Sequence, residues 1–399
     1  MQSQNKSHIL ETSIIETSIS QEKSNEDMKD KAYGSVYGAF IGDAAGGYLE
    51  FWRGGEITKE TIDYAMELNG GGVFQLQPGQ VTDDSEMAMC IVHALYKGNQ
   101  TLILHELSRY FGIWYQSMPF DIGTTTSSAL SAIDTDNLDA RMSYVQTSKI
   151  NSLSNGCLMR KTPLAVWGYK LNKQDLYAAV KLETAFTHSR ELAIGACYLY
   201  CYAIGQLIQG KAAKEVFEEV LDESAKFDQW SDYAENGKCL RQYLEEAKGH
   251  ARNLHNPMDN MGFLKIAFQW AFHYLYHDVS YHDAQWDILN RGGDTDTNAA
   301  IIGGLLGARD GKERLNQNQV KKVLDCFSDP EVYNNVKDFR VNFDLFVPRL
   351  HIAESSKINK LESIFQNAPD KLAVINQSVA YGANLCLTEL MPGWEHASI

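Results

Sequence analysis

Residues 34–46, GSVYGAFIGDAAG, decide how this chain folds. Glycine recurs at every fourth position of the segment, at Gly34, Gly38, Gly42 and Gly46. Residues four apart lie on one face of an α-helix, so the glycines form a stripe without side chains. In a membrane such a stripe would favour dimerisation, but Asp43 and the short length argue against a membrane setting. The stripe therefore predicts close helix–helix packing in a crowded core.

A second glycine-rich face occurs late in the chain, and the sequence between the two is helical in pattern. The later face contains Gly303, Gly304 and Gly307. Helical periodicity covers residues 85–95, 102–116, 174–187, 190–208, 212–221 and 262–276. Residues 72–76 form a short strand at most. We expect an all-α, compact multi-helix fold.

Composition narrows the class of protein. With 399 residues and 44% hydrophobic content, the chain can bury a large core. A net charge of -15 argues against nucleic acid or an anionic membrane as a partner. The seven cysteines are scattered without a CxxC pair, which is poor material for a zinc site or a disulfide framework. We expect a cytoplasmic protein, since the longest apolar run, residues 193–208, is too short for a comfortable membrane span.

The two ends of the chain differ from its middle. Residues 1–29 are polar and rich in Ser, Glu and Lys, so we expect a flexible extension or a marginal helix, with docking on a partner as the alternative. Residues 30–399 are expected to form a single all-α catalytic domain. Within it, residues 312–399 are helical in character but carry no chemical motif.

Two short acid clusters carry the main chemical signal. One contains Thr82, Asp83 and Asp84, and the other contains Asp294, Asp296 and Thr297. Carboxylate and hydroxyl oxygens are hard ligands that suit Mg²⁺, Mn²⁺ or Ca²⁺. Helix capping is the alternative, with Asp83 paired to Glu86 and with Asp296 and Thr297 capping a helix from Asn298. Capping explains one such residue at each place but not two carboxylates, which favours a shared cation site.

Three further segments offer candidate site residues. Glu50 ends the glycine-striped segment and is a candidate general base or ligand; alone it would be a surface carboxylate. Asp121 and Gly123 could bind sugar hydroxyls or begin a helix. Asn155 and Gly156 are expected to open a helix whose free N–H groups could bind phosphate. His188 gives a weaker signal, because a lone histidine is usually structural.

The ordered set of motifs resembles the ADP-ribosylglycohydrolase family over about residues 30–310. The set is Gly42-Asp43 leading to Glu50, Thr82-Asp83-Asp84-Ser85, Asp121-Ile122-Gly123, Asn155-Gly156 with Met159-Arg160, Thr187-His188, and Gly293-Asp294-Thr295-Asp296-Thr297. The resemblance implies a compact all-α fold around a binuclear centre of two Mg²⁺ ions, with Mn²⁺ as an alternative metal.

The resemblance also implies roles for single residues. The implied metal ligands are Thr82, Asp83, Asp84, Asp294, Asp296 and Thr297. Glu50 is implied in catalysis, together with the metal-bound Asp83, Asp84 and Asp296. Asp121 and Gly123 are implied to contact the ribose, and Asn155, Gly156 and His188 to line the ADP-ribose cleft.

The implied activity is hydrolysis of the glycosidic bond between ADP-ribose and a side chain of a modified protein. The motifs favour an arginine linkage over a serine linkage. The alternative is an immunity protein that blocks an ADP-ribosylating toxin with its N-terminal extension, with or without hydrolysis. A third possibility is a degenerate member that binds nucleotide without turnover, against which the intact acid clusters argue.

Overall fold

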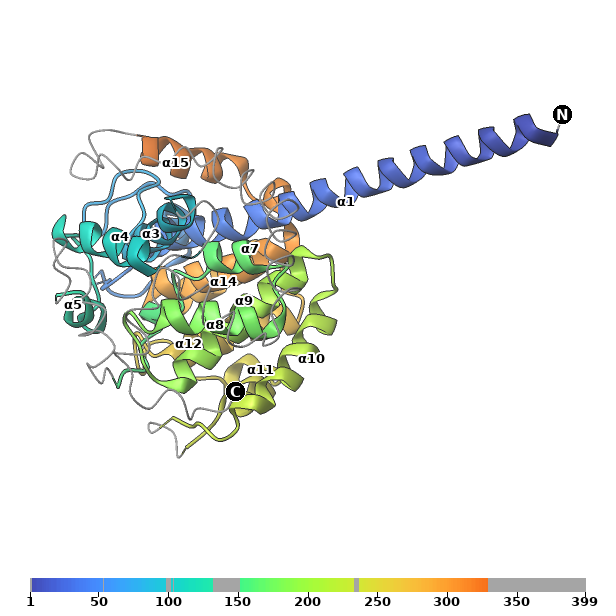
Figure 1. The fold of residues 1–399 in the computed structure, drawn as a ribbon. Coiled ribbons are helices and arrows are strands. Elements are labelled where there is room, and N and C mark those ends of the chain that lie inside the picture. The colour runs from blue at the N-terminus through green and yellow to red at the C-terminus, as the bar shows by residue number, and fades with distance from the viewer. Residues whose placement is uncertain are drawn as a thin grey trace.

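A computed structural model describes residues 2–52, 54–97, 102, 104–131, 151–232 and 237–328. The α-helices in these ranges are α1 (Gln2–Gly46), α2 (Lys59–Met66), α3 (Asp83–Lys97), α4 (Leu104–Gln116), α5 (Thr124–Leu130), α7 (Thr162–Gly168), α8 (Lys173–Thr184), α9 (Glu191–Ile208), α10 (Ala213–Ser224), α11 (Leu240–Ala247), α12 (Leu264–Tyr276), α13 (Tyr281–Arg291), α14 (Thr295–Asp310) and α15 (Gln317–Ser328). The prediction of an all-α fold is confirmed (Figure 1).

Short 3-10 helices and isolated bridges complete the described part. The 3-10 helices are η1 (Asn155–Cys157), η2 (Ala225–Phe227), η3 (Ala251–Asn253) and η4 (Lys312–Arg314). The expected strand at residues 72–76 is instead a tight turn closed by a single bridge between Gly71 and Leu76. Gly71 and Gly72 have positive φ, a conformation that glycine adopts readily. The chain therefore reverses direction at this point and does not continue as a strand.

The glycine stripes of α1 and α14 meet in a close helix–helix contact, which we call the glycine seam. A Cβ built on Gly38 would lie 2.4 Å from Gly303 O, and one on Gly307 would lie 2.0 Å from Gly34 O. Side chains at these positions would therefore push the two backbones apart. Tyr281 Oη donates to Gly38 O at 2.7 Å, which keeps a polar backbone atom of the seam satisfied.

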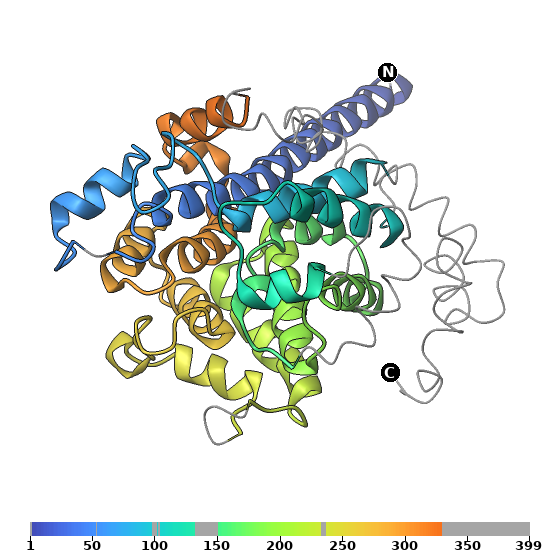
Figure 2. The ribbon, with the colours of Figure 1, turned by 90° about the vertical axis from the view of Figure 1, so that its left-hand side faces the viewer.

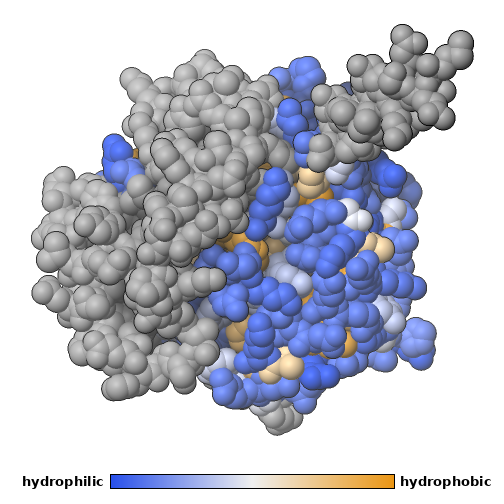
Figure 3. Space-filling view, turned by 45° about the vertical axis from the view of Figure 1, so that its right-hand side comes forward, coloured by the Kyte–Doolittle hydropathy of each residue, from blue (hydrophilic) through white to orange (hydrophobic). Residues whose placement is uncertain are grey.

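Around the seam the other helices form a compact body. Helix α9 packs on α7, α8, α10 and α14, and α12 packs on α14. By length and composition α9 could cross a membrane, but 89% of its apolar window is buried inside the protein. On the face drawn in Figure 3 the described residues are mostly hydrophilic, with small scattered apolar spots. The long apolar helix is therefore a core helix of this body.

Helix α1 is longer than the sequence pattern indicated, because residues 2–29 continue the glycine-striped helix without a break. Figures 1 and 2 show its N-terminal half running out beyond the body. Near the body, Asp30 accepts a hydrogen bond from Glu313 N at 3.0 Å, and Met28 packs against the core. These contacts hold α1 against the body at residues 28–30.

Candidate metal centre and active site

The C-terminal part of α1 holds the first acid cluster through Asp43. This carboxylate is fully buried and accepts hydrogen bonds from Thr82 N at 2.9 Å and Ser85 N at 3.0 Å. Thr82 directly precedes α3 and Ser85 lies in its first turn, where backbone donors have no partner within the helix. Sequence reasoning quoted Asp43 but gave it no role; its position beside a seam glycine was the available signal.

The second acid cluster begins α14 immediately beside the seam. Gly292 and Gly293 precede it with φ of 69° and 83°, and a Cβ on Gly293 would lie 2.5 Å from Pro257 O. Asp294 occupies the N-cap position, but its side chain makes no capping bond. Its Oδ2 instead accepts a hydrogen bond from Asn155 Nδ2 at 2.6 Å. Capping therefore does not explain this carboxylate.

The two clusters meet at the hydroxyl of Thr82. Thr82 Oγ1 lies 2.9 Å from Asp43 Oδ1, 3.3 Å from Asp84 Oδ2 and 3.2 Å from Asp296 Oδ2. One hydroxyl proton serves only one of these acceptors at a time. Thr297 Oγ1 adds a further contact to Asp84 Oδ2 at 3.2 Å. Oxygen atoms gathered this closely, with few protons between them, form the donor set of a hard cation.

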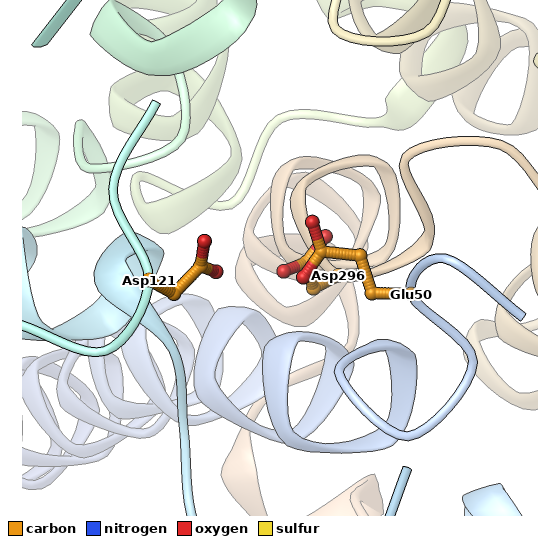
Figure 4. A group of neighbouring side chains, drawn as sticks. All are labelled: Glu50, Asp121 and Asp296. Atoms are coloured by element: carbon orange, nitrogen blue, oxygen red, sulfur yellow. The ribbon is translucent and has the colours of Figure 1, made fainter. Parts of the chain in front are cut away.

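Glu50, Asp121 and Asp296 form a second group of oxygens next to this contact. Each offers a carboxylate oxygen that lies within 4.8 Å of the other two, and Figure 4 shows them converging from three separate segments. Glu50 Oε2 and Asp84 Oδ1 are buried without a hydrogen-bond partner. Buried acceptors without donors are costly unless a cation or a ligand satisfies them, so the residues fit a bound metal.

The electrostatics of the group favour the same interpretation. Burial and the charges of Asp296, Asp121 and Asp294 raise the pKa of Glu50 far above its ordinary value. Burial, followed by the charge of Asp83, raises the pKa of Asp121 to about 8. Like charges at this spacing disfavour ionisation, and a divalent cation would reverse the effect.

The segment around Asp121 connects the first cluster to an open region. Gly123 N lies 3.4 Å from Asp83 Oδ2, within reach of a weak hydrogen bond. Gly123 is the N-cap residue of α5, so this segment does begin a helix, as the alternative interpretation expected, while Asp121 lies two residues before the cap. A Cβ built on Gly123 would meet nothing within 4 Å. A ligand group can therefore approach the backbone at this point.

Asn155 and Gly156 lie in η1 and do not begin an α-helix as expected. The cause is pairing with a remote segment, since Asn155 N donates to Gly262 O and Leu264 N donates to Leu153 O, both at 2.9 Å. The α-helix proper begins at Thr162. This pairing brings the Asn155 amide to Asp294 and lines the site with the glycines at 156 and 262.

His188 lies behind this loop and is fully buried. Its Nε2 is 2.8 Å from Ser154 Oγ, and its Nδ1 is 2.9 Å from Thr187 Oγ1. Burial, with the charges of Arg160 and Lys161, holds its pKa well below the usual value. The structure thus places His188 as a neutral support of the loop that carries Asn155 and Gly156.

Arg160 supports the same loop from the interior. The fully buried guanidinium donates to Gly156 O at 3.0 Å, to Thr187 Oγ1 at 2.8 Å and to Glu183 Oε1 at 2.6 Å. Glu183 forms ion pairs with this guanidinium and with the buried ammonium of Lys161, so one carboxylate is shared by two positive charges. Sequence reasoning quoted Arg160 in the motif without assigning it this function.

Glu86 does not cap α3, contrary to the capping alternative. Its Oε2 accepts a hydrogen bond from Trp114 Nε1 at 2.7 Å. Burial raises the pKa of this carboxyl to about 8, although the indole N–H opposes the shift. Asp83 itself is the first residue inside α3 and not its cap, so the carboxylates of Asp83 and Asp84 remain available to the site.

Comparison with known proteins decides the family. A family model described as ADP-ribosylglycohydrolase matches residues 24–345. The chain belongs to the ADP-ribosylglycohydrolase family. The match begins inside α1 and extends past the range of residues 30–310 over which the motifs suggested the resemblance. The chain is accordingly a glycohydrolase enzyme, in a family whose members depend on metal.

Relatives of this ADP-ribosylglycohydrolase agree with the assignment. It is 27% identical to the ADP-ribosyl-(dinitrogen reductase) glycohydrolase of Rhodospirillum rubrum, over 77% of this chain and 95% of the relative. It is 25% identical to an ADP-ribosylarginine hydrolase of Serratia proteamaculans, over 74% of this chain and 75% of the relative. A solved chain from an ADP-ribosylglycohydrolase-related protein complex shares the fold, with a TM-score of 0.61, 20% identity, and coverage of 82% of this chain and 99% of that chain.

Proposed function

We propose that this enzyme removes ADP-ribose from arginine side chains of modified proteins, with two Mg²⁺ ions in its acid site. The observation that carries the proposal is the convergence of Glu50, Asp121 and Asp296 beside the two acid clusters. The arginine linkage is supported by the similarity to an ADP-ribosylarginine hydrolase. Serine-linked ADP-ribose is the weaker candidate.

The residues suited to hold the ions are those with oxygens at the meeting point of the clusters, namely Thr82, Asp83, Asp84, Asp294, Asp296 and Thr297. Bound there, divalent ions would supply positive charge that orients the ribose hydroxyls and lowers the pKa of a water molecule. Mn²⁺ prefers the same oxygen ligands as Mg²⁺ and could replace it.

The side chains around the ions have separate tasks in this proposal. Glu50 Oε2 is buried without a donor, so it can take the proton of the attacking water. Asp121 and the open backbone at Gly123 can hold the ribose hydroxyls. Positive charge that develops at the anomeric carbon is stabilised by nearby carboxylates. Asn155 keeps Asp294 in place through its amide.

Release of ADP-ribose from defined peptides tests this function. Arginine-linked and serine-linked ADP-ribosyl peptides are incubated with the enzyme, with Mg²⁺ and with chelator. We expect release from the arginine-linked peptide only with metal. Release from the serine-linked peptide alone would refute the arginine assignment, and release in chelator would refute the metal requirement.

A second candidate function is occlusion of an ADP-ribosylating toxin by the N-terminal extension. The observation in its favour is that α1 extends beyond the body (Figure 1). Residues 1–23 can be deleted without touching Met28 or Asp30, which pack on the body. If the deletion removes protection of a target while Asp83→Asn with Asp296→Asn does not, occlusion is the function. The opposite pattern supports hydrolysis.

We place this activity in the cytoplasm. Of the described cysteines, Cys90, Cys157, Cys197 and Cys201 are buried free thiols, and Cys239 is a half-buried free thiol. Free thiols are typical of a reducing compartment, where glutathione and thioredoxin keep cysteines reduced. Microscopy of a tagged chain in its native cell would test the assignment, and recovery in a secreted fraction would contradict it.

A further inference from the structure

Large exposed apolar side chains lie on two of the segments that carry the acid site. They are Phe51 and Phe120. Phe51 follows Glu50 directly, and Phe120 directly precedes Asp121. Consecutive Cα atoms are about 3.8 Å apart, so these rings begin at the edge of the site. Exposed apolar residues concentrated in one place indicate a binding surface.

Three of the rings beside the site contact one another in a row, which we call the aromatic triad: Phe51, Phe74 and Phe120. The ring centroids of Phe51 and Phe74 are 6.2 Å apart in an edge-on arrangement. Those of Phe74 and Phe120 are 5.3 Å apart. Phe51 is 52% exposed and Phe120 is 45% exposed, so ring surface remains free for a ligand.

The backbone beneath the triad is strained. Non-glycine residues with positive φ in the described part are Phe51, Leu68, Gln75, Met118 and Asp278. Phe51 belongs to the triad, Gln75 follows Phe74, and Met118 is two residues before Phe120. Such conformations cost about 1–3 kcal/mol each and cluster at functional sites. The strain therefore favours a binding role for these three segments over a chance exposure.

The charge next to the triad selects the kind of ligand. Seven carboxyl groups surround the site, at Asp43, Glu50, Asp83, Asp84, Asp121, Asp294 and Asp296. Two divalent ions would balance four negative charges, so the site remains attractive to a further cation. Ring faces also attract cations, most often a guanidinium group. A ligand beside Glu50 and Asp121 is thus expected to be both positively charged and flat.

We propose that the aromatic triad binds the guanidinium group of the modified arginine and so sets the preference of the enzyme for arginine linkages. This inference rests on the proposed function, since it names the residues by which the same site would recognise the arginine linkage. The carboxylates attract the positive charge while the rings stack on its plane. A serine-linked substrate presents a neutral oxygen at this point and gains nothing from the rings.

The experiment compares Phe51→Leu with Phe120→Leu, singly and together. Leucine keeps an apolar side chain but removes the ring face. Phe51→Tyr with Phe120→Tyr restores the faces, and Val73→Ala is the matched control, because Val73 is 47% exposed beside Phe74 without a ring. KM is measured with arginine-linked and serine-linked peptides, and Kd is measured by calorimetry for free ADP-ribose.

We expect KM for the arginine-linked peptide to rise about three- to fivefold in each leucine variant and about tenfold in the double variant. The tyrosine pair and Val73→Ala should match the wild type, and Kd for ADP-ribose should stay unchanged. An unchanged KM in the double variant overturns the inference. So does an equal rise for the serine-linked peptide or a loss of ADP-ribose binding, since either would indicate a merely structural role.

Failure of the proposed function can be told apart from failure of this inference. If the wild type cleaves neither peptide, the proposed function is wrong. The intact peptides then serve as binding probes, and calorimetric Kd values replace KM for the same variants. Tighter binding of the arginine-linked peptide by the wild type than by the double leucine variant would still support recognition of the guanidinium by the triad. Equal Kd values would overturn it.

Discussion

Replacing Gly42 by alanine tests whether the glycine seam holds both the fold and the site. A Cβ at this position would lie 2.2 Å from Ala299 O and 2.9 Å from Ala300 N. Both are backbone atoms of α14, so no flexible side chain can move aside. Because carbon atoms pack best at about 3.5–4.0 Å, the two helices would have to separate by roughly 1 Å.

The expected loss of stability follows from two opposing terms. Overpacking costs about 1–3 kcal/mol, and a backbone clash belongs at the upper end of that range or beyond it. Alanine gains up to about 1 kcal/mol over glycine in helix propensity. We therefore expect the free energy of unfolding to fall by about 2 kcal/mol. The separation also moves Asp43 away from Asp296, so hydrolysis should slow in the folded variant.

Gly205→Ala is the matched control for this measurement. Gly205 is buried in α9, and its added Cβ would lie 3.3 Å from the Cα of Tyr169, which requires a shift of a few tenths of an ångström. The propensity gain is the same, so we expect a change within about 1 kcal/mol. Denaturant midpoints and slopes by circular dichroism at constant Mg²⁺ measure both variants. Equal midpoints for the two would refute the role of the seam.

Three further predictions concern the site and its support. Asp296→Asn removes one buried carboxylate that repels its neighbours, so the melting temperature in chelator should rise. Mg²⁺ should no longer raise the melting temperature of this variant, and its rate of hydrolysis should fall at least about 100-fold. Arg160→Met removes the donors to Gly156 O and Thr187 Oγ1 and should cost about 1–3 kcal/mol by denaturant titration, since Glu183 keeps its ion pair with buried Lys161. Adding Glu183→Gln should lower stability further, because the buried charge of Lys161 then loses this partner. The pKa of His188 is lower in the folded protein than in the unfolded chain. Below about pH 6.5 the unfolded chain therefore binds a proton that the folded protein does not, and the free energy of unfolding decreases as the pH is lowered. His188→Gln should flatten this dependence when midpoints are compared between pH 7 and 5 in Mg²⁺.

The parts of the fold that could be predicted depend on residues that are close together in the sequence. The glycine stripe of α1 has a fixed period, and the apolar spacing after Asp84 marks one helix face. The predicted helix over residues 174–187 is α8, whose start is set by Asn172 as its N-cap residue, accepting from Asp175 N at 2.9 Å. The two acid clusters could also be recognised in the sequence, because adjacent carboxylates repel each other and indicate a bound cation.

The parts that could not be predicted depend on contacts between distant segments. Asp43 gains its role only because the N-terminal end of α3 and the residue before it lie beside it. Residues 155–157 form a 3-10 helix because their backbone pairs with the segment at Gly262. Neither contact produces a periodic pattern of residues that could be recognised in the sequence. The aromatic triad was missed for the same reason, since its rings come from three loops.

The glycine seam also sets an order of events when the chain is made. Helix α1 ends at Gly46 and α14 begins at Thr295, so residues 47–294 are synthesised between the two halves of the contact. A growing chain therefore exposes a bare helix face, and carries Asp83 and Asp84 without their opposite cluster, until α14 emerges. Contacts so distant in sequence form late and slowly. The nascent enzyme therefore lacks a complete acid site, and is most exposed to misassembly, until α14 has been synthesised.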